Sequence, residues 1–236
     1  MIPKAYIYPA LSRPVRDLLR RRMHVVQLRA QEYGALRQLL LREGILTISR
    51  NEIKHTDDEV LKEWFSHPLV VMNASLQLER IEWLSKQITE LEETILDLTT
   101  QKADYKRLLG IPGIGKILAL TILYEVGEIA RFQNDRHFGS YCRLVPGVAQ
   151  SGTLNRRGRA SKQGNHYLKN AFSQAAVVAV RSYPKIRGCY ERQLARHRGS
   201  ATKLVAYNVI AHKLAQAVFH VLKDETEYRE ELLFGK

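Results

Sequence analysis

Cysteines, long apolar runs and a signal sequence are scarce or missing in this chain. Cys142 and Cys189 are the two cysteines, too few and too far apart for a disulfide framework or a zinc site. The longest apolar run, residues 117–126, is shorter than the roughly 18 residues that a membrane span needs. No apolar segment follows Met1 that would serve as a secretory signal. These absences predict a cytoplasmic protein with no membrane partner, and a buried helix over residues 117–126.

Acidic residues are also scarce over one long stretch. Residues 131–200 hold 14 Lys or Arg against 2 acids, Asp135 and Glu191, within a chain whose formal net charge is +13. A basic run often forms only a solvated face, but this concentration favours a polyanionic partner, and DNA in particular. Hydrophobic residues make up 45% of the 236 residues, which is enough to bury a core.

The spacing of apolar residues predicts an all-α fold. We expect helices over residues 13–43, 57–65, about 73–109, 167–180, 190–198 and 202–222. Pro14 suits the first turn of the first helix and Gly44 its end, and Thr56 or Asp57 would be the N-cap of the second. We divide the chain into a helical linker (1–107), a C-terminal domain (108–223) and a charged tail (224–236) that frays.

Within the long helix, apolar residues step by alternating threes and fours, which is a coiled-coil seam over residues 81–98. The seam consists of Ile81, Leu84, Ile88, Leu91, Ile95 and Leu98. Two interpretations stay open. The seam packs in a helical hairpin against residues 15–41, or it forms a coiled coil that makes the protein a homodimer.

A glycine-rich turn joins two helix-like segments between residues 108 and 131. Residues 110–116 read Gly-Ile-Pro-Gly-Ile-Gly-Lys, followed directly by the apolar run. In a helix-hairpin-helix element, the second helix presents its free N–H groups and positive dipole end to a DNA phosphate. We therefore predict DNA contacts at Gly113, Gly115 and Lys116. The plainer alternative is a Pro-Gly turn between two core helices.

Farther along the chain, the Ser151-Gly152 dipeptide opens a basic loop. Its cations are Arg156, Arg157, Arg159, Lys162 and Lys169, which we predict to contact DNA. A serine before glycine is usually a turn residue, and no His–Asp relay lies nearby in sequence. Guanidinium groups, however, clamp phosphate and stabilise the charge that develops in phosphoryl transfer. Ser151 among these arginines therefore suits attack on a DNA phosphodiester, giving a covalent phosphoserine.

Several separate motifs occur in an order that resembles a known family. They are Gly-Ile-Pro-Gly-Ile-Gly (110–115), Phe-Gly-Ser-Tyr-Cys-Arg-Leu-Val-Pro (138–146), Gln-Ser-Gly (150–152) and Gly-Arg-Ala-Ser-Lys-Gln-Gly-Asn (158–165). Residues 108–222 resemble the C-terminal transposase domain of the IS-110 family, which includes the Piv-type DNA invertases. Residues 6–9 and 13–23 resemble the family's linker. The resemblance implies a recombinase of an insertion element, with Ser151 as its serine nucleophile.

The resemblance also implies partners. Family members pair this domain with an N-terminal RuvC-like domain, whose acidic tetrad holds a divalent metal, and use a guide RNA encoded by the element. A guide RNA would have a plausible contact in the basic helix at residues 16–29, although a surface-exposed helix explains that charge equally well.

The chain departs from the family's pattern at its N-terminus, because it begins where the RuvC-like domain should already have ended. We read Asp57, Asp58 and Glu59 as helix N-terminal charges and expect no metal site in this chain, with Mg²⁺ only where the RuvC-like domain is present. The leading prediction is therefore an incomplete, nucleoid-associated transposase. The alternative is a non-catalytic helix-hairpin-helix DNA-binding or regulatory protein, and a weaker third option is an RNA-binding accessory protein.

Overall fold

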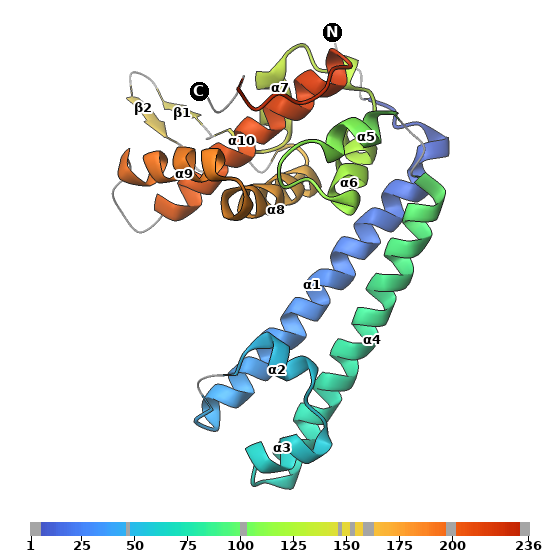
Figure 1. The fold of residues 1–236 in the computed structure, drawn as a ribbon, viewed down its shortest axis with the longest axis vertical. Coiled ribbons are helices and arrows are strands. Elements are labelled where there is room, and N and C mark those ends of the chain that lie inside the picture. Colours follow the sequence, from blue (N-terminus) through green and yellow to red (C-terminus); the bar gives the residue numbers. More distant parts are fainter. Residues whose placement is uncertain are drawn as a thin grey trace. The chain divides into compact units, whose positions relative to one another are not determined.

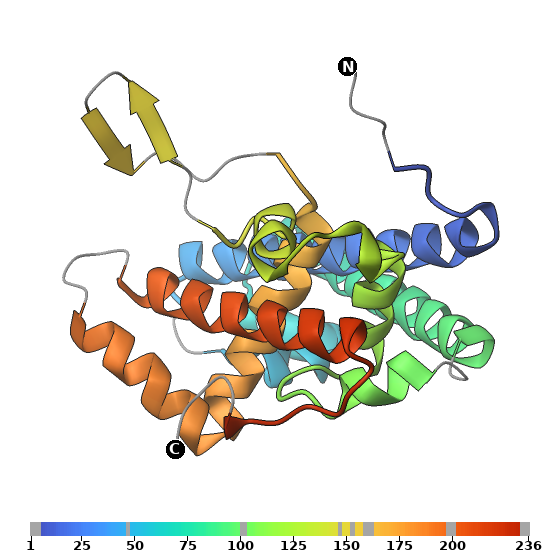
Figure 2. The ribbon, with the colours of Figure 1, turned by 90° about the horizontal axis from the view of Figure 1, so that it is seen from above.

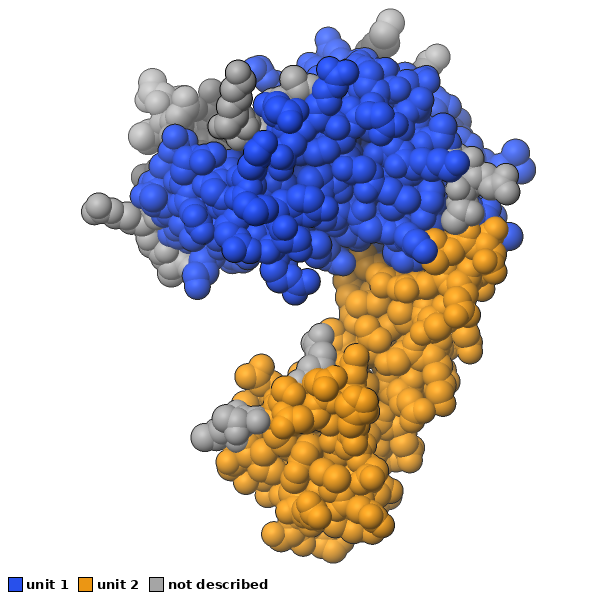
Figure 3. All heavy atoms as spheres, in the orientation of Figure 1, with its two compact units in different colours: residues 1–16, 98–236 blue, residues 17–97 orange. Residues whose placement is uncertain are grey.

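The computed structural model describes residues 6–45, 48–99, 103–145, 148–151, 154–157, 163–196 and 202–231. The chain divides into two compact units, coloured separately in Figure 3: residues 1–16 with 98–236, called unit 1, and residues 17–97, called unit 2. Ten α-helices dominate the described residues, together with two 3-10 turns and one β-hairpin, as labelled in Figure 1. The predicted all-α class is confirmed. No helix of the described residues has both the length and the apolar character that crossing a bilayer requires.

Unit 2 is a helical hairpin. After a 3-10 turn (Ala10–Ser12), α1 (Arg13–Arg42) runs antiparallel to α4 (Pro68–Thr99). Arg22 Nε donates to Glu92 at 2.7 Å near one end, and Arg80 Nε lies 2.8 Å from Glu32 farther along. Most of the apolar seam is turned inward: Leu84 and Ile88 pack with Val25, and Ile81 and Ile95 are buried, whereas its last member, Leu98, is exposed. Of the two interpretations of the seam, the intramolecular helical hairpin is the one present in the structure.

The end of α1 follows from local sequence signals. Gly44 has φ +81°, a left-handed conformation that glycine adopts without steric cost. The amide of Ile45 donates to the carbonyl of Leu40 at 2.9 Å, and the amide of Gly44 donates to Leu41 at 3.2 Å. This pattern is a Schellman motif, and it confirms Gly44 as the predicted stop.

Two short helices, α2 (Arg50–Lys54) and α3 (Asp58–Trp64), connect α1 to α4. The N-cap of α3 is Asp57, whose carboxylate accepts from the amides of Glu59 and Val60, so its predicted role as a helix N-terminal charge is confirmed. The predicted helix over 73–109 was wrong at both ends. It begins at Pro68, since a first helical residue needs no N–H partner. It ends at Thr99, and α5 (Ala103–Leu109) is a separate helix.

Unit 1 is built around α10 (Thr202–Lys223), which packs against α5, α7 (Asp135–Tyr141), α8 (His166–Ser182) and α9 (Pro184–Arg196). Between α5 and α7 lie α6 (Lys116–Val126) and a 3-10 turn (Ile129–Arg131). The buried Phe138 ring meets those of Phe172 and Phe219, each at 6.1 Å. The predicted helix over 190–198 was wrong at its start, because Pro184 begins α9 instead of interrupting the chain.

Two parts of unit 1 differ from the predicted loop and frayed tail. The basic loop contains a β-hairpin of β1 (Val148–Ser151) and β2 (Leu154–Arg157), which extends away from the helices in Figure 2. The described part of the tail, residues 224–231, lies against the unit. Glu225 pairs with Arg107 at 3.6 Å and Glu230 with Lys185 at 3.4 Å.

Candidate nucleic-acid interface

The turn between α5 and α6 presents Gly110, Gly115 and the adjoining Lys116 on the surface. Its apolar members, Ile111 and Ile114, are buried and fix the turn to the core. Gly115 is the N-cap of α6 and has no side-chain cap, and a Cβ built on it would meet no atom within 4 Å. Lys116, the first residue of α6, is exposed. An uncapped helix start with open space beside it and an adjacent cation is suited to an anion.

Gly113 differs from Gly115 in its backbone torsion and in how closely α8 approaches it. Its φ is +80°, and a Cβ placed on it would lie 2.1 Å from the carbonyl oxygen of Ala175 and 3.1 Å from the amide nitrogen of Ala179. Both atoms belong to the backbone of α8 and cannot move independently of that helix. The structure therefore gives Gly113 a packing role, in which the turn closes directly onto α8.

The β-hairpin puts Ser151 and the first two arginines on neighbouring strands. The strands are antiparallel, with Ser151 opposite Leu154, Ala149 opposite Arg156 and Val148 opposite Arg157. Paired positions share a face of a hairpin and successive positions alternate. Positions 151 and 156 therefore belong to one face and position 157 to the other. Sequence reasoning missed these strands because they carry few β-branched or aromatic residues.

The other predicted contacts of this segment are divided between α8 and undescribed positions. Gly152, Arg159 and Lys162 lie outside the described residues. Lys169 is half-buried in the first turn of α8, where its amide donates to the carbonyl of Asn165 at 3.3 Å.

The turn and the base of the hairpin lie at opposite ends of α6. Before α6 begins, Gly113 touches Ala175 and Ala179 in the later half of α8. Near the end of α6, Glu125 accepts a 2.7 Å hydrogen bond from Asn165, the N-cap of α8. The two helices therefore run antiparallel, and the 11 residues of α6 separate the turn from Asn165 by roughly 16 Å.

Glu125 is a residue that sequence reasoning missed. It is 3% exposed, and a buried carboxylate is costly unless it is hydrogen-bonded. The signal was present, because it is the one acid within the apolar run of residues 117–126. Its hydrogen-bond partner, Asn165, is 40 residues away and could not be predicted from that run.

The arginines predicted to contact RNA make contacts within the chain. Arg16 stacks on the ring of Tyr8 at 3.7 Å. Arg22 pairs with Glu92, and Arg29 donates to the hydroxyl of Ser85 at 3.2 Å. An RNA contact at residues 16–29 stays a prediction, and these three side chains already have protein partners.

Tyr141 and His166, which flank the hairpin segment in the sequence, pack against other rings. The ring of Tyr141 packs beside Phe132 at 5.2 Å and under the Arg131 guanidinium at 4.5 Å. His166 is exposed and its ring lies 3.9 Å from that of Tyr167.

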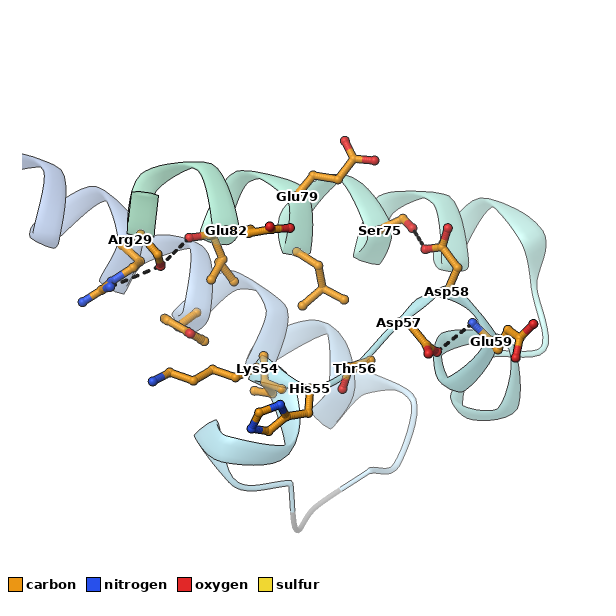
Figure 4. Close-up of a pocket in the computed structure, with 15 residues that line it drawn as sticks. Arg29, Lys54, His55, Thr56, Asp57, Asp58, Glu59, Ser75, Glu79 and Glu82 are labelled. Carbon is orange, nitrogen blue, oxygen red and sulfur yellow. Dashed lines mark hydrogen bonds between the residues drawn. The ribbon is translucent and has the colours of Figure 1, made fainter. Parts of the chain in front are cut away.

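Unit 2 has a cavity of about 880 Å³ between α1, α2, α3 and α4, shown in Figure 4. Its charged lining is mixed: Arg29, Lys54 and His55 against Asp57, Asp58, Glu59, Glu79 and Glu82. Asp58 is occupied by a hydrogen bond from Ser75. This balance does not favour a polyanion, so the cavity is not part of the nucleic-acid interface. Among the described residues there is no cluster of three His, Cys, Asp or Glu side chains that could hold a metal ion.

Burial and hydrogen bonds shift a few titratable groups of unit 1. Burial lowers the pKa of His212 on α10, with Lys213 adding to the effect and Asp135 opposing it. A hydrogen bond from Gln216 lowers the pKa of Asp135. Burial raises the pKa of the Cys142 thiol well above its usual range, so this cysteine is a buried, unreactive thiol.

Comparison with known proteins supports the resemblance stated above. Residues 105–191 match the family described as Transposase IS116/IS110/IS902 family. The chain is 29% identical over 154 residues to a "Probable family 20 transposase" of Pseudomonas aeruginosa, covering 64% of this chain and 45% of that protein. It is 27% identical over 145 residues to the transposase for insertion sequence element IS1111A of Coxiella burnetii, covering 60% and 39%.

A further relative is named as a gene-inverting protein. The chain is 26% identical over 190 residues to the pilin gene-inverting protein of Moraxella lacunata, covering 78% of this chain and 58% of that protein. In these three comparisons the chain spans from 39% to 58% of the relative's length. Residues 105–191, which include both the glycine turn and Ser151, therefore match the IS116/IS110/IS902 family of transposases.

Proposed function

We propose that this chain acts on DNA as part of a recombinase in which Ser151 is the nucleophile. Its Oγ would attack the phosphorus of a phosphodiester, forming a serine–phosphate bond and breaking the bond from phosphorus to a deoxyribose oxygen. The serine proton is lost to solvent, and the departing deoxyribose oxygen takes up a proton. The observation that carries the proposal is the hairpin register, in which positions 151 and 156 belong to the same face, within the segment that matches the transposase family.

The proposal divides the arginines of the hairpin by role. Arg156 shares the face of Ser151, so its guanidinium would stabilise the charge on the phosphate under attack. Arg157 belongs to the opposite face and would hold a neighbouring phosphate, fixing the DNA without taking part in the reaction.

A second DNA contact would lie at the start of α6. Gly115 and Lys116 would bind a backbone phosphate through the free N–H groups of the first turn and through the ammonium group. Gly113 would support this contact indirectly, by closing the turn onto α8. The excess of cations over acids in residues 131–200 would supply attraction that does not depend on DNA sequence.

The metal-binding domain, the guide RNA and the homodimer are also proposals. A RuvC-like domain would supply the acidic groups and Mg²⁺, and no step above passes through a metal held by the described residues. Guide-RNA binding is likewise proposed only by resemblance, and homodimerisation only from the spacing of the apolar seam. A dimer through the seam of residues 81–98 would have to open the α1–α4 hairpin, because Leu84 and Ile88 are buried within the chain. With DNA as its partner, the protein would be associated with the nucleoid.

The experiment is a search for a covalent protein–DNA adduct. The purified chain, alone and mixed with a RuvC-like domain of a family member, is incubated with Mg²⁺ and labelled duplexes that carry element ends. Denaturing gels then report bound DNA. We expect an adduct with the parent and none with Ser151→Ala, at unchanged DNA affinity. Ser182→Ala, which changes an exposed serine on α8, is the matched control and should keep the adduct.

A non-catalytic DNA-binding or regulatory protein is the second candidate. The observation that favours it is the lack of any metal-binding cluster among the described residues. If no adduct forms in any mixture while duplex DNA still binds, this candidate replaces the first. If structured RNA outcompetes duplex DNA at the same salt concentration, an RNA-binding accessory role replaces both.

A further inference from the structure

The point where the hairpin segment returns to the core is held by a buried polar pair. Glu125, near the end of α6, is 3% exposed, and Asn165, at the start of α8, is 8% exposed. The Nδ2 of Asn165 donates to Oε2 of Glu125 at 2.7 Å. A buried hydrogen bond to a carboxylate is strong, and it holds two elements that are 40 residues apart in one geometry.

Asn165 is fixed by three further contacts. Its Oδ1 accepts from the amides of Tyr167 and Leu168 at 2.9 and 3.1 Å, which caps α8. Its own amide donates to the carbonyl of Tyr141 at 2.6 Å. Gly164 beside it has φ +103°, and a Cβ there would lie 2.5 Å from that same carbonyl oxygen. The side chain therefore has one orientation, with its oxygen toward α8 and its nitrogen toward Glu125.

The point where the segment leaves the core is also held by an amide side chain. Leu144 is 1% exposed, and its amide donates to the carbonyl of Gly139 at 3.1 Å. Its carbonyl accepts from Nδ2 of Asn208 on α10 at 2.9 Å. The chain between residues 145 and 163, which includes the β-hairpin, thus starts and ends at residues locked to α6, α7 and α10.

A hairpin of two four-residue strands has little stability of its own, so its orientation depends on the two points from which it emerges. Chemistry at a phosphodiester requires the nucleophile to be placed within a fraction of an ångström. A helix cap alone does not need a carboxylate behind it, because the Oδ1 of Asn165 already performs that task. The hydrogen bond from Asn165 to this buried carboxylate therefore adds a constraint on the position of residue 165 beyond the helix cap.

We propose that Glu125, acting through Asn165, is a positioning residue that sets the base of the hairpin carrying Ser151. The inference rests on the proposed function, since it assigns Glu125 to the placement of that nucleophile. Glu125 touches no DNA, and it acts by fixing where the segment joins α8.

The test exchanges the donor and the acceptor of the buried hydrogen bond between residues 125 and 165. Asn165→Asp keeps the shape and the cap of α8 but turns a second carboxylate oxygen toward Glu125. Adding Glu125→Gln restores the bond in reverse, because the glutamine amide donates to the aspartate. Ser182→Ala on α8 serves as the control. Hydrogen exchange of the amides in residues 148–157, adduct yield and DNA affinity are measured below each variant's thermal midpoint.

We expect faster exchange of residues 148–157 in Asn165→Asp, with an adduct yield lowered by about tenfold to a hundredfold, the loss typical of a misplaced reacting group. DNA affinity should change by less than about threefold, because the phosphate contacts remain. The double variant should recover both the protection and the yield. If it stays as impaired as Asn165→Asp, or if exchange in that variant equals the parent's, the positioning role is wrong. If the parent itself forms no adduct, the proposed function fails, and the exchange data still decide the role of Glu125.

Discussion

Gly113→Ala tests whether the glycine turn is built by packing against α8. The left-handed φ of +80° costs an L-residue about 1–2 kcal/mol. The new Cβ would lie 2.1 Å from the carbonyl oxygen of Ala175, so the turn or α8 must shift, and overpacking of this kind costs about 1–3 kcal/mol. The free energy of unfolding should therefore fall by about 2–5 kcal/mol. For a chain of this size, that lowers the thermal midpoint by on the order of 10 °C.

The assay is urea denaturation followed by circular dichroism, with Gly115→Ala as the matched control. Gly115 has an ordinary negative φ of −88° and open space beside it, so its variant should change stability by less than about 1 kcal/mol, the usual effect at an N-cap. Equal stability of the two variants would refute the packing role. A large loss of DNA affinity in Gly115→Ala, with stability kept, would instead point to a direct backbone contact at that glycine.

Three further predictions concern charge, titration and helix propensity. Arg157→Ala should weaken duplex binding and reduce the slope of log affinity against log salt by about 1, whereas Arg37→Ala on the exposed face of α1 should not. Equal slopes for Arg157→Ala and the parent would refute a phosphate contact at Arg157. Burial lowers the pKa of His212, so the unfolded state binds more protons than the folded state, and the free energy of unfolding should fall as pH drops through and below 6.5. His212→Gln should flatten this pH dependence; a stability profile parallel to the parent's would contradict the prediction. Gly34→Ala, at an open position inside α1, should raise the stability of unit 2 by about 0.5–1 kcal/mol in thermal denaturation, and a loss would show an unexpected contact.

The parts of the fold that could be predicted are those encoded within a few residues. The Schellman end of α1 at Gly44 and the N-cap at Asp57 depend on side chains and torsions local to each helix end. The burial of the seam on α4 follows from its period, although the period alone could not tell an internal hairpin from a dimer.

The features that could not be predicted depend on tertiary contacts or on very short elements. Helices of five to seven residues, such as α2 and α7, carry too few apolar residues to show a period. Proline usually interrupts a helix, yet Pro68 and Pro184 are each the first residue of a helix, where proline is tolerated. The packing of Gly113 on α8 could not be predicted, because its neighbour Ala175 lies about sixty residues away along the chain.

The antiparallel packing of α6 on α8 sets a distance between two parts of the proposed interface. Gly113 on Ala175 fixes one end, and Glu125 on Asn165 fixes the other, so the free N–H groups of α6 and the base of the hairpin are held roughly 16 Å apart. Duplex DNA rises about 3.4 Å per base pair, so this separation spans about five base pairs. Ser151 lies beyond that base, because it pairs with Leu154 at the end of the strands farthest from residue 165. The buried pair would therefore set where the hairpin segment starts relative to a phosphate bound at Lys116.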